Sequence, residues 1–247
     1  MQPDPATLAM AWHAAQDLAD GEVAFVGIGA PGLAAMIARR LHAPGITMIF
    51  ESGVIGADPD KPPLSTGSPS VARGAAMLGS MMDVFAALQK GIIDVGLLSG
   101  AEVDRFGNLN STVIGHYDRP TVRLPGSGGA HDIAVLARRT VLLMPHEPKR
   151  FVQRVSYVTS PGHPGVGPRR PGPGRGAGPA ALATPRALFR FDDGEMTLAA
   201  VAPGFTADQA VEGIPWVVRR RQTLASLPPL PALDGPAFHF MHKGGAE

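Results

Sequence analysis

The chain has 247 residues, of which 45% are apolar, so it is long enough to bury the core of one large α/β domain. Charged residues account for only 17% and the formal net charge is +1, which argues against a nucleic-acid-binding module with a basic face. The chain has no cysteine, and this excludes disulfides, thiolate nucleophiles and cysteine-ligated metal sites.

The sequence shows neither a membrane segment nor a secretion signal. No apolar run reaches the length of about 18 residues that a membrane helix needs. The first twenty residues contain Asp4, Asp17 and Asp20 but no lysine or arginine, so they lack the basic start of a signal peptide. We therefore expect a cytoplasmic protein that has no membrane or nucleic-acid partner.

The first fifty residues follow the pattern of a βαβ unit. Apolar residues at helical spacing predict a helix over Pro5–Leu18, and short apolar runs predict strands over Val23–Val26 and Ile46–Phe50. Between these strands, a glycine turn at Gly27–Gly32 leads into a predicted helix over Leu33–Leu41. This order of elements indicates parallel strands joined by a right-handed crossover.

The middle of the chain continues this alternation of helices and strands. Helices are predicted over Met77–Leu88 and about Asp132–Arg138, and strands over Ile92–Leu98, Asn110–Ile114, Arg139–Leu143 and Val152–Val158. The strand candidates are continuous apolar runs, which are typical of strands covered on both faces. The expected fold is therefore an α/β fold with an open, mainly parallel sheet and flanking helices.

The segment Pro161–Pro179 differs in composition from the rest of the chain. It consists mostly of glycine and proline, with Arg169, Arg170 and Arg175 among them. Such a segment forms neither a helix nor a central strand. We expect an exposed, mobile loop whose arginines are solvated.

Order is predicted to return after this loop. A hairpin is expected over Ala187–Phe191 and Met196–Val201, and Thr206 with Gln209 fits a capping box that opens a short helix. The prolines that follow Leu227 indicate an irregular tail. We therefore expect one domain over residues 1–225, which includes the loop 161–179, and a tail over 226–247.

The turn Gly27–Gly32 has the spacing G-x-G-x-x-G between a predicted strand and a predicted helix. Glu51 ends the next predicted strand and lies 22 residues after Gly29, where a dinucleotide-binding fold places its ribose-binding acid. A dinucleotide-binding module is therefore one interpretation. Pro31 is unusual in such a loop, and the motif alone favours a glycine turn that binds no ligand and leads into a helix.

Glu51 is a candidate for chemistry in its own right. It follows the apolar run Ile46–Phe50 directly and precedes Ser52-Gly53. Catalytic groups in open α/β sheets gather at the carboxyl ends of strands. A poorly solvated carboxylate in that place suits a base or a covalent nucleophile. The alternative is a carboxylate that only caps the following turn, and position alone favours neither.

Two further segments are rich in polar residues or glycine. Ser99–Asn110 has the residue types of a calcium loop but not their order, so we expect a loop held by its own Asp and Asn side chains. Pro125–Asp132 contains several glycines, whose N–H groups can converge on a phosphate or an oxyanion. A wide turn before a helix explains this segment as well, and His131 is interpreted as structural. We assign no metal site.

Taken in chain order, these segments resemble the β subunit of class I CoA-transferases, and most closely that of the glutaconate CoA-transferase type. The similarity extends from about Leu8 to Val218. It rests on five blocks: Phe25–Gly32, Phe50–Gly56, Gly100–Thr112, Val122–Ala130 and Thr159–Gly162. Five blocks in the right order are a specific signal, whereas a lone G-x-G-x-x-G is a weak one.

The resemblance implies a role for each site residue. Glu51 would attack an acyl-CoA thioester, and CoA would reach an acceptor carboxylate through an acyl anhydride and a glutamyl-CoA thioester. Oxyanion or CoA-binding donors would come from Gly128, Gly129 and Ala130. The remaining residues implied to line the site are Gly27, Gly29, Ser52 and Gly53.

The resemblance also implies a partner chain. The active site would form where this chain meets an α subunit, in a hetero-oligomer of two α and two β subunits or more. Coenzyme A would be a co-substrate, with no tightly bound cofactor. Two alternatives stay open: a hydrolase on the same scaffold, which cleaves the CoA thioester of a ring-fission product by activating water, and the dinucleotide-binding module.

Overall fold

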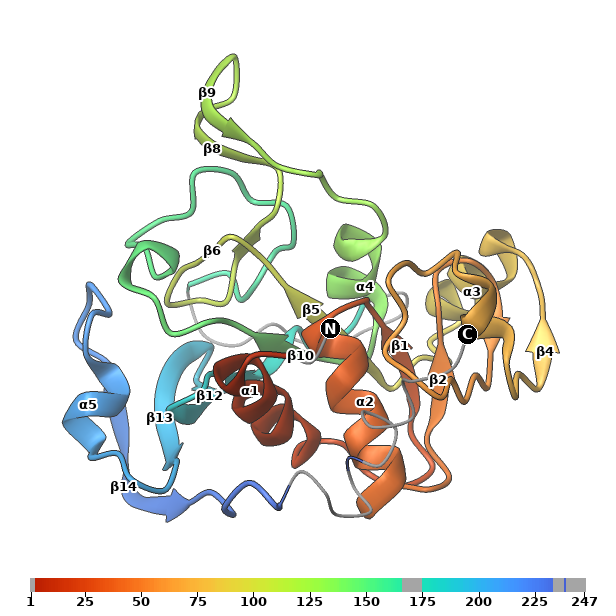
Figure 1. Cartoon of the computed structure of the whole chain (residues 1–247). Helices are drawn as coiled ribbons and strands as arrows, with labels where there is room; N and C mark the ends of the chain where they lie inside the picture. Colours follow the sequence, from red (N-terminus) through yellow and green to blue (C-terminus); the bar gives the residue numbers. More distant parts are fainter. Residues whose placement is uncertain (1–2, 166–174, 233–237, 239–247) are drawn as a thin grey trace.

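The computed structural model describes residues 3–165, 175–232 and 238 of the chain. Its centre is an open ten-stranded sheet with the order β14-β13-β12-β11-β10-β5-β1-β2-β3-β4 (Figure 1). Its strands are β1 (Val23–Val26), β2 (Thr47–Ile49), β3 (Val54–Ile55), β4 (Met77–Leu78), β5 (Val95–Ser99), β10 (Arg139–Leu143), β11 (Pro179–Ala183), β12 (Ala187–Asp192), β13 (Glu195–Val201) and β14 (Arg219–Ser226). The five central strands from β2 to β11 run parallel, which confirms the predicted open, mainly parallel sheet.

The two edges of the sheet depart from the parallel arrangement. At one edge, β11, β12 and β13 are antiparallel, which confirms the predicted hairpin, and β14 then pairs parallel with β13. At the other edge, β2, β3 and β4 form short antiparallel pairs. Two small antiparallel pairs lie outside this sheet: β6 (Glu102–Val103) with β7 (Leu109–Asn110), and β8 (Val113–His116) with β9 (Arg119–Arg123).

Helices cover both faces of the sheet (Figure 1). The helices are α1 (Pro5–Ala15), α2 (Ala30–Leu41), α3 (Met81–Gln89), α4 (Ala130–Leu136) and α5 (Ala207–Val211), with 3-10 turns at Pro69–Ala72 and Pro148–Arg150. α1 and α2 pack on one face, and α3 and α4 pack on the other. Consecutive strand residues serve opposite faces: Leu97 belongs to the α1–α2 core and Leu98 to the α3–α4 core. This explains why the central strands are continuous apolar runs.

Two predicted elements are wrong because local side-chain bonds override the apolar pattern. The helix predicted from Met77 begins only at Met81, because Ser80 and Asp83 form a capping box, and residues 77–78 join the sheet as β4. The strand predicted over Asn110–Ile114 is divided between β7 and β8. There the Asn110 side chain accepts from the N–H groups of Thr112 and Val113 and bends the chain.

The segment predicted as a strand over Val152–Val158 is also wrong, since it forms no strand in the structure. Its backbone bonds go to other partners: the N–H of Val152 donates to the carbonyl of Val103, and the N–H of Ser156 donates to the carboxylate of Glu102. Only Val155 of this segment is buried. The apolar run therefore forms an irregular cover over β6.

The glycine- and proline-rich segment is not the exposed loop that its composition predicts at either of its described ends. Gly162, His163 and Gly176 are buried, and the N–H of Gly176 donates to the carbonyl of Val135 at 2.7 Å. Pro179 opens β11, which lies between β10 and β12. A proline is tolerated there because it is the first residue of the strand. Residues 166–174 and most of the predicted tail lie outside the described residues, so the division at residue 225 stays a prediction.

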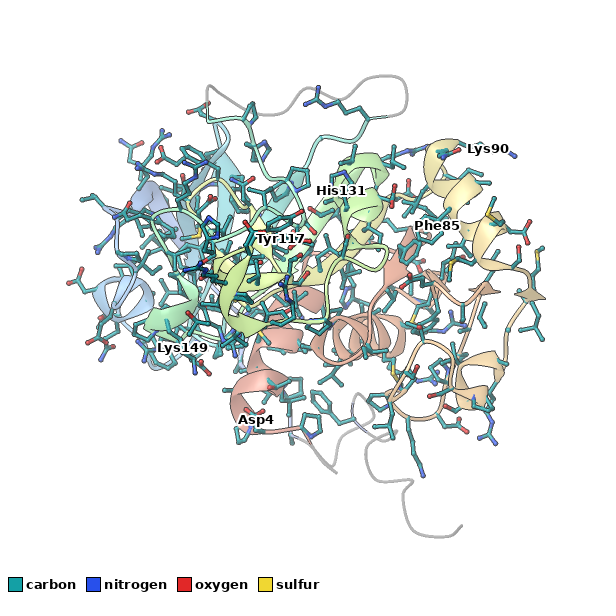
Figure 2. All side chains as sticks on the ribbon, turned by 90° about the horizontal axis from the view of Figure 1, so that it is seen from above. Asp4, Phe85, Lys90, Tyr117, His131 and Lys149 are labelled. Atoms are coloured by element: carbon teal, nitrogen blue, oxygen red, sulfur yellow. The ribbon has the colours of Figure 1, made fainter. Side chains whose placement is uncertain are left out.

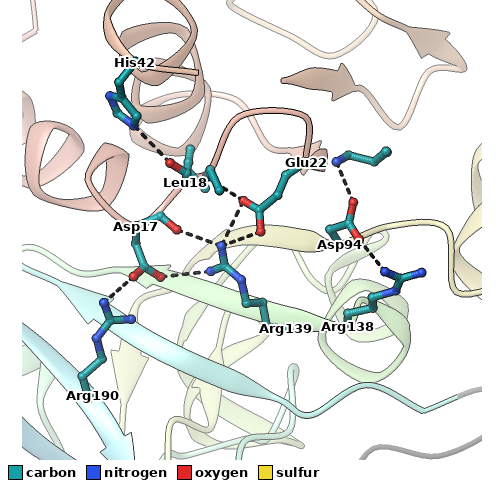
Figure 3. A network of polar contacts seen from close by, with 10 residues as sticks. Asp17, Leu18, Glu22, His42, Asp94, Arg138, Arg139 and Arg190 are labelled. Atoms are coloured by element: carbon teal, nitrogen blue, oxygen red, sulfur yellow. Dashed lines mark hydrogen bonds and ion pairs between the residues drawn. The ribbon is translucent and has the colours of Figure 1, made fainter. Parts of the chain in front are cut away.

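A polar network joins the end of α1 to the sheet (Figure 3). Arg139 donates to the side chain of Asp17 at 3.0 Å and to Glu22 at 2.8 Å, and Arg190 pairs with the second oxygen of Asp17. The Asp17 side chain is only 8% exposed. Its charge therefore depends on the two guanidinium groups, since a poorly solvated carboxylate without a partner is costly.

We expect Arg139→Met to lower the free energy of unfolding by about 2–4 kcal/mol, because it leaves two poorly solvated carboxylates short of a partner. Chemical denaturation measures this loss. The control is Arg220→Met, which removes an arginine from the well exposed Asp208 and is expected to cost at most about 1 kcal/mol. Equal losses in the two variants would contradict the role assigned to the network.

His13 predicts a dependence of stability on pH. Its ring is buried in α1, its Nδ1–H donates to the carbonyl of Thr184 at 2.8 Å, and burial lowers its pKa below the ordinary value of 6.5. The unfolded chain therefore binds the proton more readily than the folded chain. The stabilisation is complete above about pH 6.5 and is lost as the pH falls toward and through the lowered pKa.

We expect His13→Asn to flatten the decrease of the unfolding free energy between pH 7.5 and 5.5, although it also lowers stability at every pH. Urea titrations at several pH values measure the slope. His116→Asn is the control, because His116 lies exposed at the tip of the β8–β9 hairpin. An unchanged slope in His13→Asn would show that the buried imidazole is not the titrating group.

Candidate active site

Glu51 lies in a tight turn between β2 and β3. Phe50 is fully buried, its N–H donates to the carbonyl of Val54, and its carbonyl accepts from the N–H of Gly53. Gly53 has a φ of 103°, and a Cβ there would lie 2.4 Å from the carbonyl oxygen of Gly79. Only glycine fits this position. The turn therefore holds the Glu51 side chain at the carboxyl end of β2, where the sequence predicts it.

The Glu51 side chain lines a cavity of about 230 Å³. The cavity lies at the carboxyl ends of β1, β2 and β5, which is the edge where open α/β sheets place their ligands. Its remaining lining residues are Phe25, Val26, Gly27, Ile28, Pro31, Thr66, Leu97, Leu98, Ser99, Ser127, Gly129, Ala130 and Ile133. Glu51 is thus the only charged side chain among the described residues that line this cavity.

The glycine loop before α4 lies directly against the Glu51 carboxylate. A methyl group placed on Gly128 would lie 3.8 Å from both carboxylate oxygens, and one placed on Gly129 would lie 3.5 Å from the carboxyl carbon. No described residue accepts a hydrogen bond from the backbone N–H of Gly128 or Gly129. The loop therefore brings uncommitted N–H groups close to a carboxylate, as a site that stabilises an oxyanion requires.

Phe85 closes the glycine loop from the side of α3. A methyl group on Gly129 would meet the tip of the Phe85 ring at 2.8 Å, and the ring makes an edge contact with Phe25 at 6.2 Å between centroids. Figure 2 labels Phe85 on α3 and His131 at the start of the neighbouring α4. The sequence did not identify Phe85, because an aromatic residue on an amphipathic helix carries no signal of a site.

The structure brings most of the predicted site residues together. Gly27, Gly129 and Ala130 line the cavity with Glu51, and Gly128 contacts its carboxylate. Gly29 is exposed and caps α2 with a φ of 74° instead of lining the cavity. Two further predicted residues, Ser52 and Gly53, shape the Glu51 turn, and no described residue bonds the buried hydroxyl of Ser52. Ser99, Ser127 and Thr66 were not predicted as lining residues.

The polar loop at residues 99–110 is a structural knot. The buried Glu102 carboxylate accepts from Asn110 at 2.7 Å and from the N–H and hydroxyl of Ser156. Asp104 accepts from Asn108 and from the N–H of Phe106. Burial raises the pKa of Asp104, and these hydrogen bonds oppose that increase. The expected loop of self-bonding Asp and Asn side chains is confirmed.

The described residues hold neither a metal-binding cluster nor a membrane helix. No group of three or more His, Asp or Glu side chains within them is arranged to hold a metal ion. No helix in that part of the chain is long and apolar enough to cross a membrane.

Comparison with known families decides between the interpretations of this site. The sequence pattern of the family described as Coenzyme A transferase matches residues 7–213. The chain belongs to the coenzyme A transferase family. Membership of this family confirms the resemblance found in the sequence and replaces the dinucleotide-binding interpretation of Gly27–Gly32.

Curated members of the coenzyme A transferase family match most of the chain. It is 41% identical over 210 residues to one subunit of the 3-oxoadipate CoA-transferase of Pseudomonas knackmussii, covering 83% of this chain and 81% of the relative. It is 35% identical over 211 residues to one subunit of the glutaconate CoA-transferase of Acidaminococcus fermentans, covering 80% of this chain and 77% of the relative. Both relatives are subunits by name, and both names correspond to the β-type chain that the sequence resembles.

Solved structures share the fold. Glutaconate coenzyme A-transferase from Acidaminococcus fermentans superposes with a TM-score of 0.82 at 28% identity, covering 96% of this chain and 93% of that one. The decarboxylase AibA/AibB superposes with a TM-score of 0.81 at 24% identity, covering 98% and 97%. A decarboxylase on this fold shows that the scaffold alone does not determine the reaction.

Proposed function

We propose that this chain is the nucleophile-bearing subunit of a CoA-transferase, which moves coenzyme A from an acyl-CoA donor to a carboxylic acid through a covalent intermediate at Glu51. The observation that carries the proposal is the position of Glu51, whose carboxylate lies in the cavity against Gly128 and Gly129. A carboxylate is a suitable nucleophile in a chain that has no thiol.

The proposed reaction begins when a Glu51 oxygen attacks the thioester carbonyl carbon. The C–S bond breaks, CoA leaves as a thiolate with the bonding electrons, and Glu51 becomes a mixed anhydride. The thiolate then attacks the Glu51 carbonyl, which releases the donor acid as a carboxylate and leaves a glutamyl-CoA thioester. The acceptor carboxylate reverses these two steps, so Glu51 is regenerated without net transfer of protons or electrons.

Each attack in this sequence produces a tetrahedral oxyanion beside Glu51. The backbone N–H groups of Gly128 and Gly129 have no described acceptor and lie next to the carboxylate, so we assign them to this oxyanion. Such donors cost little reorganisation, because the loop already holds them in place. We keep Ala130 as part of the same wall, since it lines the cavity.

A partner chain completes the proposed site. Next to the Glu51 turn, Met77, Leu78, Met81 and Met82 expose large apolar side chains, and we call these four residues the apolar rim. The carbonyl of Gly53 accepts from the N–H of Gly79, which ties the rim to the turn. Exposed apolar residues gathered beside a site are typical of a protein interface. We propose that the α subunit of a hetero-oligomer covers them.

The proposed substrates are acyl-CoA esters and acids of the dicarboxylate class. Two relatives carry 3-oxoadipate and glutaconate in their names, and both are dicarboxylates. No described lining residue of the cavity is a lysine or an arginine. A cation for the distal carboxylate would therefore come from the α subunit, so we expect that subunit to set the choice of acid.

The test uses the complex purified through a tag on this chain together with its natural partner. The complex is incubated with a dicarboxylyl-CoA and a second, unlabelled acid, and chromatography separates the CoA esters. Appearance of the second acid's CoA ester, with little free CoA, supports the transferase. Release of free CoA without a new ester indicates the hydrolase. Thermal stabilisation by NAD but not by CoA would contradict both.

A further inference from the structure

The glycine loop that faces Glu51 is irregular, so something else must hold it in place. Its first part is clamped by Ser111: the Ser111 hydroxyl donates to the carbonyl of Gly126 at 2.9 Å, and the N–H of Gly126 donates to the carbonyl of Ser111 at 2.8 Å. Gly126 lies two residues before Gly128. This reciprocal pair therefore sets where the loop enters the site.

The other end of the loop is held at His131. The Nδ1–H of His131 donates to the carbonyl of Thr159 at 3.1 Å, and the N–H of His131 donates to the hydroxyl of Ser127 at 3.3 Å. The imidazole thus acts as a tether, in agreement with the structural role expected from the sequence. The tether fixes the start of α4, one residue after Ala130.

Thr159 contacts both ends of the loop. Its carbonyl holds His131, while its hydroxyl accepts from the N–H of Ser111 at 2.9 Å and shares a 2.7 Å hydrogen bond with the hydroxyl of Thr112. Thr159 is only 3% exposed, and its own N–H donates to the carbonyl of Leu109 in β7. A single buried residue therefore connects the rigid polar knot to both flanks of the loop.

We propose that Thr159 is a positioning residue for the transferase, which keeps the N–H groups of Gly128 and Gly129 in register with the Glu51 carboxylate through its hydroxyl. This inference rests on the proposed function. Thr159 does not line the cavity, so it acts through Ser111 and the loop instead of touching the reacting atoms. Misplacing a catalytic group by about 1 Å costs up to about 100-fold in rate.

The test compares Thr159→Val, which keeps the shape but removes the hydroxyl, with Thr159→Ser, which keeps the hydroxyl. In the complex with its partner, we expect Thr159→Val to lower kcat for CoA transfer by roughly 10- to 100-fold. KM for the acyl-CoA is expected to change by less than about twofold, because the lost stabilisation acts on the transition state. Thr159→Ser should restore kcat to within about threefold of the unmodified protein.

A second measurement separates this inference from the proposed function. Amide hydrogen exchange of the peptide containing residues 124–131 reports loop positioning without any assay of activity. We expect exchange at Gly126 to be at least about 10-fold faster in Thr159→Val than in Thr159→Ser. Should Thr159→Val fail to fold, Ser111→Ala removes the clamp on Gly126 and must show the same two effects.

Several results would overturn the role of Thr159. One is an unchanged kcat in Thr159→Val while the unmodified complex transfers CoA. Another is an equal loss in Thr159→Ser, which would show that the hydroxyl is not what matters. If the unmodified complex transfers no CoA, the proposed function fails, and loop exchange alone then decides the positioning role: equal exchange in both variants refutes it.

Discussion

Replacing Glu51 by glutamine is expected to lower the rate of CoA transfer by at least about 10³-fold, because an amide cannot form the anhydride or the thioester. Glutamine has nearly the same shape as glutamate. Among the described residues, no ion pair holds the Glu51 carboxylate. The variant should therefore fold and assemble like the unmodified protein, as circular dichroism and size-exclusion chromatography will measure.

Two further variants sharpen this prediction. Glu51→Asp keeps the charge but withdraws the attacking oxygen by one methylene, so it should retain little activity. Glu212→Gln makes the same carboxylate-to-amide change on an exposed side chain after α5, and it should leave the rate unchanged. A rate for Glu51→Gln within about tenfold of the unmodified complex would contradict the role of Glu51 as nucleophile.

A lysine in the apolar rim is expected to abolish assembly with the partner chain, and CoA transfer with it. Leu78 is 67% exposed and Met82 is 77% exposed, so the variants Leu78→Lys and Met82→Lys should not disturb the fold of this chain. Burying an unpaired ammonium group in an interface costs several kcal/mol, which is enough to dissociate the complex. Co-purification and size-exclusion chromatography measure the loss.

The matched control is Val217→Lys. Val217 is 94% exposed and lies next to β14, whereas the rim includes β4, and these two strands form opposite edges of the sheet. The control should bind the partner as the unmodified chain does. If both rim variants still co-purify with the partner as well as Val217→Lys does, the partner binds elsewhere, and the rim has no part in the interface.

The sequence predicted the parts of the fold that depend on local pattern. β1 and β10 have the predicted bounds, because apolar runs of four or five residues between turn signals leave little freedom. Thr206 and Gln209 form the predicted capping box, since its residues are only three apart. Glu51 was identifiable as a candidate for the same reason: it directly follows a strand whose carboxyl end faces ligands in this class of fold.

The rest of the fold depends on contacts between distant residues. β14 carries Arg219, Arg220 and Arg221, and its residues are mostly exposed, so it has no apolar run from which a strand is predicted. It pairs with β13 at the sheet edge, where its arginines meet aspartates of other elements. Such an edge strand is established by its neighbour and not by its own sequence.

The support of the site was out of reach for a similar reason. Thr159 is 48 residues from Ser111 in sequence, yet a 2.9 Å hydrogen bond joins them. The sequence block Thr159–Gly162 indicated family membership but gave no physical role to the threonine. The segment 152–158, which precedes it, was predicted as a strand, and its real role as an irregular cover over β6 depends on the buried carboxylate of Glu102.

The most direct test of the central claim is mass spectrometry of Glu51 itself. The complex is mixed with an acyl-CoA, reduced with borohydride and digested with trypsin, and the peptide of residues 41–73, in which Glu51 is the only glutamate, is analysed. Our account predicts that the Glu51 carboxyl is reduced to an alcohol only when acyl-CoA is present. An unmodified Glu51 in a complex that still consumes acyl-CoA would contradict the covalent transferase mechanism.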